Sequence, residues 1–267
     1  MSEVAWSFGA AAPVRALALA TEDARTHAWG GSTGAGVKVA VVDSGIDADH
    51  PRVGGVDGWV AMEVDLDEPD GVRRVPGPHE DLVGHGTACA GIIRSIAPEV
   101  SLHSVRVLGP NLKGRGAMLV AGIAWAVEHG MDVVNLSLSS RSPAWQAPLH
   151  EVADLAHHAG VVLVCAANNV PGPTYPAEFA SVVSVASRRD HDPWGLTANP
   201  CPPVDFAAHG TDVDVAWADG GSIVATGNSF AAPHVAGMAA LVRARHPGLN
   251  AYQVKALLHA ACDNARP

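Results

Sequence analysis

The sequence predicts an α/β fold in which a mostly parallel central sheet carries helices on both faces. The first observation is that short apolar runs alternate along the chain with segments of helical periodicity. The second is that these runs lack polar–apolar alternation, which is typical of parallel strands buried on both faces. The third is size, because 267 residues with 48% hydrophobic and only 16% charged side chains can bury a large core as one domain.

The expected strands are short apolar runs bounded by turn residues or helices. The first, "VKVAVV", lies between Gly36 and Asp43. Because it is apolar on both faces, it is expected near the centre of the sheet. Further strands are predicted at residues 101–108, 132–138, 161–166 and 181–187.

The expected helices lie between these strands and after them. A run of small residues after Ser229 suits a central helix that other elements approach closely. Pro233 is expected in the first turn of that helix, where a backbone N–H has no intrahelical partner. Helices are predicted at residues 21–29, 86–96, 116–129 and 148–159, from residue 229 onward, and at 250–261.

The stretch 57–81 differs from the rest of the chain because acidic residues and prolines are concentrated in it. It is expected to be an exposed excursion between two core elements. A solvated acidic loop is favoured over an ion or substrate site. The acidic residues are Asp57, Glu63, Asp65, Asp67, Glu68, Asp70, Glu80 and Asp81.

Net charge and hydropathy restrict the partners of the protein. A formal charge of −10 argues against nucleic acid or an anionic membrane surface as a partner. No run approaches the roughly 20 apolar residues of a membrane span. The first residues include Glu3 and are interrupted by Pro13 and Arg15, which is a poor match to a signal peptide. A cytoplasmic localisation is therefore predicted.

The four cysteines show neither a CxxC pair nor a zinc-ligand spacing. Cys89 and Cys165 lie in apolar runs and are expected to be small buried hydrophobic residues. All four are predicted to be free thiols in a reducing compartment. None of the 14 histidines has a metal-ligand spacing either.

Three polar residues stand where reactive groups gather in a parallel sheet. Asp43 follows the strand in "VAVVDSGID", His85 opens a helix in "GHGTACAG", and Ser229 opens another in "GNSFAAPHVAG". A serine at a helix start is by itself more often an N-cap. A serine hydroxyl becomes nucleophilic when a histidine takes its proton, and a carboxylate orients that histidine. Together the three residues predict nucleophilic catalysis.

These three segments, in the order Asp, His, Ser, resemble those of subtilisin-like serine proteases, the subtilases of peptidase family S8. The resemblance runs from about Thr26 to the last helix. It implies a three-layer subtilisin-like fold and a serine endopeptidase that forms an acyl-enzyme at Ser229. It also implies that Asp43, His85 and Ser229 are the catalytic residues, and that His234, inside a family motif, is structural.

The resemblance assigns further site residues. In "VLVCAANNV" it makes Asn169 the side chain that binds the oxyanion, while an alternative register would use Asn168. The segment "LKGRG" resembles the cleft edge that pairs with a peptide substrate as an added strand, and "LSLSS" resembles a wall of the specificity pocket. Ordinary loop structure is the alternative for both. The implied substrate-binding residues are Lys113, Gly114, Arg115, Ser137, Leu138 and Ser139.

Several positions depart from the family pattern. Asn228 replaces a usual threonine, and either side chain could assist the oxyanion hole. Arg52 stands at a usual aspartate of the strong calcium site, and the calcium-loop insertion in the helix after His85 is missing. The strong calcium site is thus expected to be lost and no cofactor is predicted, although residues 63–70 leave a weaker ion site open. Residues 1–25 are expected to be an N-terminal extension, and 26–267 a compact catalytic domain without a propeptide domain.

Alternatives remain within and outside proteolysis. A dedicated peptide-maturation protease would remove a leader or pass the acyl group to an amine, forming a ring in natural-product biosynthesis. An inactive peptide-binding domain would keep the cleft without catalysis. An esterase of the α/β-hydrolase type would need GxSxG with the histidine after the serine. The expected partners are a peptide or protein substrate and, in the maturation alternative, a partner protein or biosynthetic enzyme.

Overall fold

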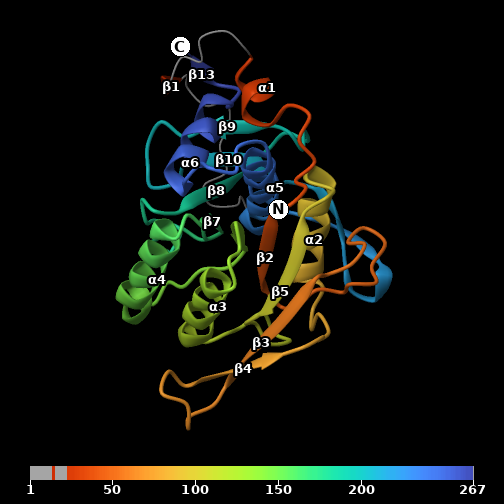
Figure 1. The fold of residues 1–267 in the computed structure, drawn as a ribbon, viewed down its shortest axis with the longest axis vertical. Coiled ribbons are helices and arrows are strands. Elements are labelled where there is room, and N and C mark those ends of the chain that lie inside the picture. The colour runs from red at the N-terminus through yellow and green to blue at the C-terminus, as the bar shows by residue number, and fades with distance from the viewer. Residues whose placement is uncertain (1–13, 16–22, 267) are drawn as a thin grey trace.

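The computed structural model describes residues 14–15 and 23–266, and a nine-stranded sheet forms its middle layer (Figure 1). Within this sheet, every strand pair is parallel except β3–β4 and β10–β9. The predicted mostly parallel sheet is therefore confirmed. In spatial order the strands are β4 (Val72–Pro76), β3 (Gly58–Val64), β5 (Ser101–Arg106), β2 (Lys38–Asp43), β6 (Val133–Leu136), β7 (Val162–Ala166), β8 (Val183–Arg188), β10 (Phe206–His209) and β9 (Leu196–Ala198).

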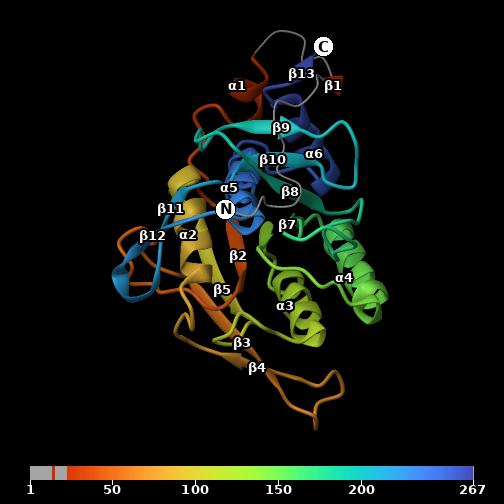
Figure 2. The same ribbon diagram turned by 180° about the vertical axis from the view of Figure 1, so that it is seen from behind.

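Helices cover both faces of this sheet (Figures 1 and 2). In β2, Val39 and Val41 belong to one hydrophobic core while Ala40 and Val42 belong to the other, which explains the unbroken apolar run. One core contains residues of α1 (Ala24–Trp29), α2 (His85–Ile96), α5 (Asn228–Arg245) and α6 (Ala251–Ala260). The other contains residues of α3 (Gly116–Glu128) and α4 (Gln146–His158). Within the described residues, no helix combines the length and apolarity needed to cross a membrane.

Helix α5 is the central buried helix that the run of small residues predicted. Between Asn228 and Val242, all residues except Ser229 are buried. At Gly237 a side-chain Cβ would lie 2.7 Å from Cβ of Ile96, so α2 and α5 can approach only because this residue is glycine. Pro233 is inside the helix rather than in its first turn, so that prediction is wrong.

The prediction that residues 57–81 form an exposed loop is wrong for much of the stretch. Strands β3 and β4 pair antiparallel, and β3 extends the main sheet by pairing with β5. Its buried residues Val60, Ala61 and Met62 were obscured in the sequence by the surrounding acidic residues. The carboxylates of Glu63 and Asp70 form ion pairs with arginines of β4. The hairpin projects from the sheet edge at the bottom of Figure 1.

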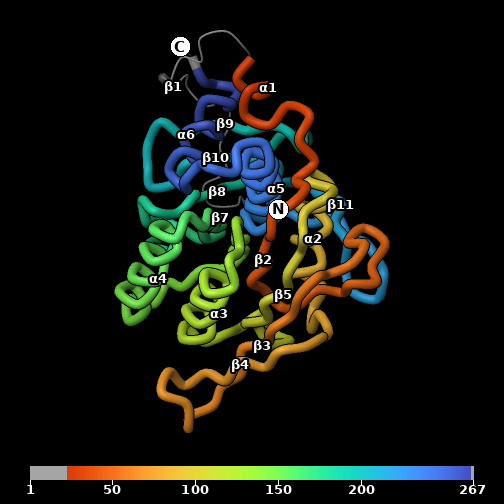
Figure 3. The backbone as a smooth tube through the Cα atoms, viewed as in Figure 1, coloured from red at the N-terminus to blue at the C-terminus, as the bar shows by residue number. Residues whose placement is uncertain are grey.

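Short strands also went unpredicted near the C-terminus. Strands β9 and β10 extend the sheet, and β11 (Val213–Ala216) and β12 (Ser222–Ala225) form a separate antiparallel ribbon. β1 (Val14–Arg15) pairs with β13 (Ala265–Arg266). Most of the predicted extension, residues 1–13 and 16–22, lies outside the described residues, and its boundary falls within α1, which packs beside α5 and α6 (Figure 3).

Candidate active site

Asp43 and His85 meet where β2 ends and α2 begins. Nδ1 of His85 lies 2.8 Å and 3.0 Å from the two carboxylate oxygens of Asp43. The Asp43 side chain is fully buried and that of His85 is 10% exposed, which leaves the other edge of the ring as its accessible part. Gly86 permits this approach, since a Cβ there would lie 2.0 Å from the carbonyl oxygen of Gly45.

The electrostatics of this pair favour a histidine that accepts a proton. Burial lowers the pKa of His85, but the charge and hydrogen bond of Asp43, helped by the charge of Asp81, raise it above its usual value. A carboxylate on Nδ1 both fixes the ring and stabilises the imidazolium. The arrangement is that of a general base.

Asp81 organises the loop around the pair, a role that the sequence analysis missed. Its carboxylate accepts hydrogen bonds from the Ser44 hydroxyl at 2.7 Å and from the backbone N–H groups of Gly84 and Thr87 at 2.9 Å and 2.8 Å. The Ser44 hydroxyl in turn accepts from the backbone N–H of Gly86 at 3.1 Å. Its position four residues before His85 was the available signal, and the general acidity of residues 57–81 concealed it.

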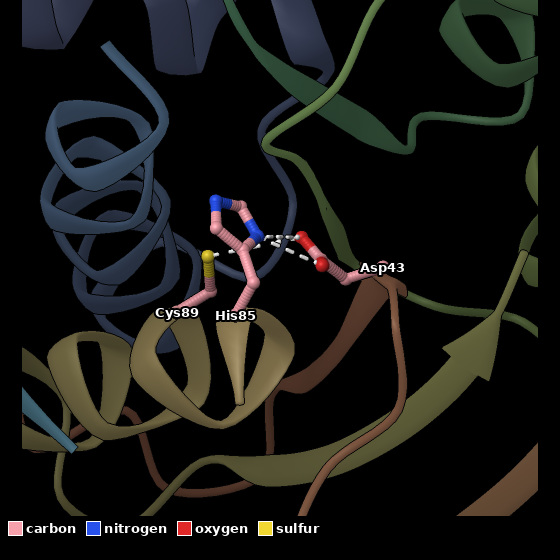
Figure 4. Close-up of side chains that lie close together, drawn as sticks. All are labelled: Asp43, His85 and Cys89. Atoms are coloured by element: carbon pink, nitrogen blue, oxygen red, sulfur yellow. Dashed lines mark hydrogen bonds and ion pairs between the residues drawn. The ribbon is translucent and has the colours of Figure 1, made fainter. Parts of the chain in front are cut away.

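Cys89 lies one helical turn after His85 and points at the same pair (Figure 4). Its Sγ is 3.9 Å from Oδ2 of Asp43 and 3.2 Å from Oγ of Ser137. Burial raises the pKa of this thiol, and the nearby charge of Asp43 raises it further, so Cys89 is an uncharged thiol. Cys89 and Cys165 are buried as predicted, and all four cysteines are unpaired.

Ser229 is the second residue of α5, and the helix start is anchored beside His85. The rings of His85 and Phe230 are 5.4 Å apart between centroids. Pro233 has no N–H to donate to the Ser229 carbonyl four residues earlier. The Ser137 hydroxyl donates to that carbonyl instead, at 2.8 Å. The hydrogen bond that Pro233 cannot make within α5 is therefore replaced by one from the Ser137 side chain, which holds the backbone of Ser229 in place.

Asn169 and Ser229 face the same small space. A Cβ built on Gly227 would lie 3.2 Å from Oγ of Ser229 and 3.5 Å from Nδ2 of Asn169. Oδ1 of Asn169 accepts a hydrogen bond from the backbone N–H of Asn228 at 2.9 Å, which leaves the Nδ2 donor for another group. The Asn168 side chain instead accepts from the backbone of Val170. The geometry favours Asn169 over Asn168 as an oxyanion ligand.

The Asn228 side chain does not serve the oxyanion as the sequence analysis allowed. It is fully buried. Its Oδ1 accepts from the backbone N–H of Ser187 at 2.8 Å, and its Nδ2 donates to the carbonyls of Ala167 and Asn168 at 3.1 Å and 3.3 Å. Asn228 therefore joins the start of α5 to the ends of β7 and β8.

Most of the residues predicted to bind substrate line one cavity of about 320 Å³. Ser137 is not among its lining residues and is occupied with the Ser229 carbonyl, as described above. Ser139 accepts a hydrogen bond from the Thr174 hydroxyl at 2.6 Å. The predicted residues that line the cavity are Lys113, Gly114, Arg115, Leu138 and Ser139.

Arg52 forms an ion pair at the position where the calcium aspartate was expected. Its guanidinium donates to the Asp214 carboxylate at 2.7 Å and to the Asp214 carbonyl at 3.0 Å. A guanidinium repels cations and offers them no lone pair. Helix α2 also runs from His85 to Ile96 without an inserted loop.

Comparison with known proteins gives a consistent result. The model of the subtilase family matches residues 34–266. Subtilisin E of Bacillus subtilis (strain 168) is 34% identical over 243 residues, which cover 84% of this chain and 60% of that protein. Subtilisin of Bacillus pumilus is 33% identical over 243 residues, covering 84% and 83%. This chain thus spans only 60% of the length of subtilisin E.

Solved structures show the same architecture. A cold-adapted subtilisin-like serine proteinase superimposes with a TM-score of 0.69 at 29% identity, covering 86% of this chain and 83% of the other. A psychrophilic protease, S41, superimposes with a TM-score of 0.72 at 25% identity, covering 91% of each chain. These similarities support the three-layer fold expected from the motifs.

Proposed function

Because this chain belongs to the subtilase family, we propose that it is a serine endopeptidase that cleaves peptide bonds through an acyl-enzyme at Ser229. The observation that carries the proposal is the buried Asp43–His85 pair beside the anchored start of α5. A base with a raised pKa, a serine at a helix N-terminus and an amide donor facing the same space suit acyl transfer.

In the first half of the reaction, Oγ of Ser229 attacks the peptide carbonyl carbon, and its proton passes to Nε2 of His85. Asp43 stabilises the imidazolium that results. Nδ2 of Asn169 and the backbone N–H of Ser229 donate to the oxyanion of the tetrahedral intermediate. The C–N bond then breaks as His85 gives its proton to the leaving amine.

In the second half, His85 takes a proton from water, whose oxygen attacks the acyl carbon. The ester bond to Ser229 breaks, and the proton returns from His85 to Oγ. The products are a carboxylate and the amine released earlier, so the reaction consumes one water for each bond cut. If an amine replaced that water, the same site would ligate or cyclise peptides.

The substrate proposed is an extended peptide segment that lies along residues 112–116 as an added strand. Strand addition uses main-chain hydrogen bonds and requires little of the substrate side chains. The neighbouring cavity lined by Leu138 and Ser139 would take one side chain, with Lys113 and Arg115 exposed at its rim. We also propose that catalysis requires no calcium at Arg52, which is supported by the ion pair of that residue with Asp214.

The proposal is tested by incubating an unstructured protein such as casein with the purified chain and, separately, with Ser229→Ala, followed by mass spectrometry of the products. We expect internal cleavage by the wild type only, with product masses that sum to the substrate plus one water for each bond cut. Products that lack the water would establish acyl transfer to an amine. The absence of any product from folded wild-type protein would contradict the proposal.

A further inference from the structure

A second group of histidines lies in a cavity outside the candidate active site. The cavity has a volume of about 470 Å³ and is lined by His191, His209 and His234 among other residues. His209 ends β10, His234 lies in α5, and His191 lies in the loop between β8 and β9. Proteolysis as proposed above uses none of the three.

The two buried histidines are both held in one tautomer by backbone carbonyls. Nδ1 of His234 lies 2.9 Å from the Phe230 carbonyl oxygen, and Nδ1 of His209 lies 2.9 Å from the Asp190 carbonyl oxygen. A carbonyl oxygen only accepts hydrogen bonds, so each Nδ1 carries a proton, and in the neutral form of each ring Nε2 holds the lone pair. Within residues 23–266, neither Nε2 has a hydrogen-bond partner.

This pattern is the one by which proteins prepare imidazoles for metal ions. A metal-ligating histidine almost always donates its other ring N–H to a carbonyl or carboxylate, which fixes the tautomer and orients the lone pair. His234 is 3% exposed and His209 is 7% exposed, so both side chains are largely buried in the wall of the cavity.

The spacing of the rings is compatible with a shared ion. Two imidazoles bound to one tetrahedral Zn²⁺ have their centroids about 5 Å apart. The centroids of His209 and His234 are 5.3 Å apart, and those of His191 and His209 are 5.9 Å apart. His191 is exposed, so its side chain can turn toward the other two. The three nitrogens do not yet converge: within the described part of the chain, only Asp43, His85 and Cys89 bring three ligand atoms within 4.8 Å.

The two arginines that line the cavity are held by other protein groups. The Arg52 guanidinium is paired with Asp214. The guanidinium of Arg94 donates to four backbone carbonyls, those of Val53, Gly55, Pro98 and Val100. The three imidazoles are thus the cavity groups with a nitrogen lone pair to offer.

We propose that His191, His209 and His234 form a binding site for a divalent transition-metal ion of the Zn²⁺, Co²⁺ and Ni²⁺ class. Imidazole nitrogens suit these ions, whereas Ca²⁺ and Mg²⁺ prefer oxygen ligands. His209 and His234 supply two preset ligands, and His191 closes the site by rotation. A water or an external ligand completes the coordination.

The test is titration of the untagged full chain with Co²⁺, followed by its absorption spectrum, after removal of metal with a chelator and dialysis. The Ser229→Ala variant is used so that binding is measured without proteolysis. We expect one ion per chain, a visible spectrum typical of nitrogen and oxygen ligands, displacement by Zn²⁺ and no displacement by Ca²⁺. The melting temperature should rise by about 5 °C when the ion is in large excess over its dissociation constant.

Single substitutions locate the ion. His191→Gln, at an exposed position, is expected to weaken binding about tenfold or more, and His234→Gln to do the same. His158→Gln, an exposed histidine of α4, is the matched control and should leave binding unchanged. Absence of binding, or binding unaffected by His191→Gln, would overturn the proposal. So would a thiolate-to-cobalt charge-transfer band, because it would place a cysteine among the ligands of the ion.

Discussion

Two of the buried histidines, His85 and His234, lie in different regions of the molecule and differ in the partner of Nδ1. Beside the start of α5, His85 is bound to the carboxylate of Asp43, and its pKa is raised although burial lowers it. Farther along α5, His234 is bound to the uncharged carbonyl of Phe230, and burial lowers its pKa to about 4. The charge on the partner therefore decides whether a buried imidazole becomes a base or a neutral lone-pair donor.

Helix α5 contributes residues to both regions, Ser229 to the first and His234 to the second. Pro233 removes one backbone donor from α5, and the Ser229 carbonyl is then held by Ser137 from β6's C-terminal end. The next residue, His234, uses its ring to donate to the carbonyl of Phe230. Side chains therefore bind two successive backbone carbonyls of α5, those of Ser229 and Phe230. The first contact lies at the proposed catalytic serine, and the second orients a proposed metal ligand.

The largest effect is expected from Asp43→Asn, which replaces the charged partner of His85 by a neutral one. An amide that donates to Nδ1 favours the wrong tautomer, and kcat should fall about 10⁴-fold, a loss known from other Ser-His-Asp proteases. Hydrolysis of a chromogenic peptide, with circular dichroism to verify folding, measures this. A fall of less than tenfold would show that the charge of Asp43 does not control His85.

Asn169→Ala tests the donor that faces Ser229. We expect kcat to fall about 10²–10³-fold with little change in KM, because the hydrogen bond forms only to the developing oxyanion; the magnitude is that known from subtilisin. Asn168→Ala is the matched control and should retain most of the activity, since its side chain accepts only from Val170 among the described residues. Equal losses in both variants would remove the assignment.

His85 and His234 are expected to take up a proton at different pH values. His85 must be neutral to accept the proton, so kcat/KM should fall as the pH drops through a raised pKa, with a midpoint above the ordinary value of about 6.5. In NMR spectra of Ser229→Ala, the His234 ring signals should stay constant from about pH 8 to about pH 5, because its pKa is about 4. Titration of His234 together with His85 would contradict the account.

The smallest effect is expected at the rim of the substrate cavity. Lys113→Ala and Arg115→Ala should raise KM about two- to fivefold for peptides with an acidic side chain near the scissile bond, since exposed charge pairs are weak. Neutral peptides serve as the control and should be unaffected. A uniform change in KM for both peptide classes would indicate a loss of backbone shape rather than of charge.

The sequence predicted the parts of the site that follow from topology. Asp43, His85 and Ser229 each stand at the end of a strand or the start of a helix, so their positions follow once the sheet is known to be parallel. The strand β3 was missed because its three buried residues lie among carboxylates. The roles of Asn228 and Ser137 depend on hydrogen bonds between elements distant in sequence, which no local pattern reveals.

The sequence also did not predict the cavity that is lined by the three histidines. His191, His209 and His234 come from a loop, a strand and a helix, so their spacing matches no metal-binding motif. His234 looked structural because it lies in the same segment as Ser229. The cytoplasmic localisation and the loss of the calcium site remain predictions.

The most direct test of the central claim, an assembled triad at Asp43, His85 and Ser229, is the intact mass of the protein after treatment with a fluorophosphonate. The reagent is applied to the wild type, to Ser229→Ala and to Asp43→Asn, with a chelator present. We expect one adduct on the wild type, none on Ser229→Ala and much slower labelling of Asp43→Asn. An unlabelled but folded wild type, or an adduct that persists in Ser229→Ala, would contradict it.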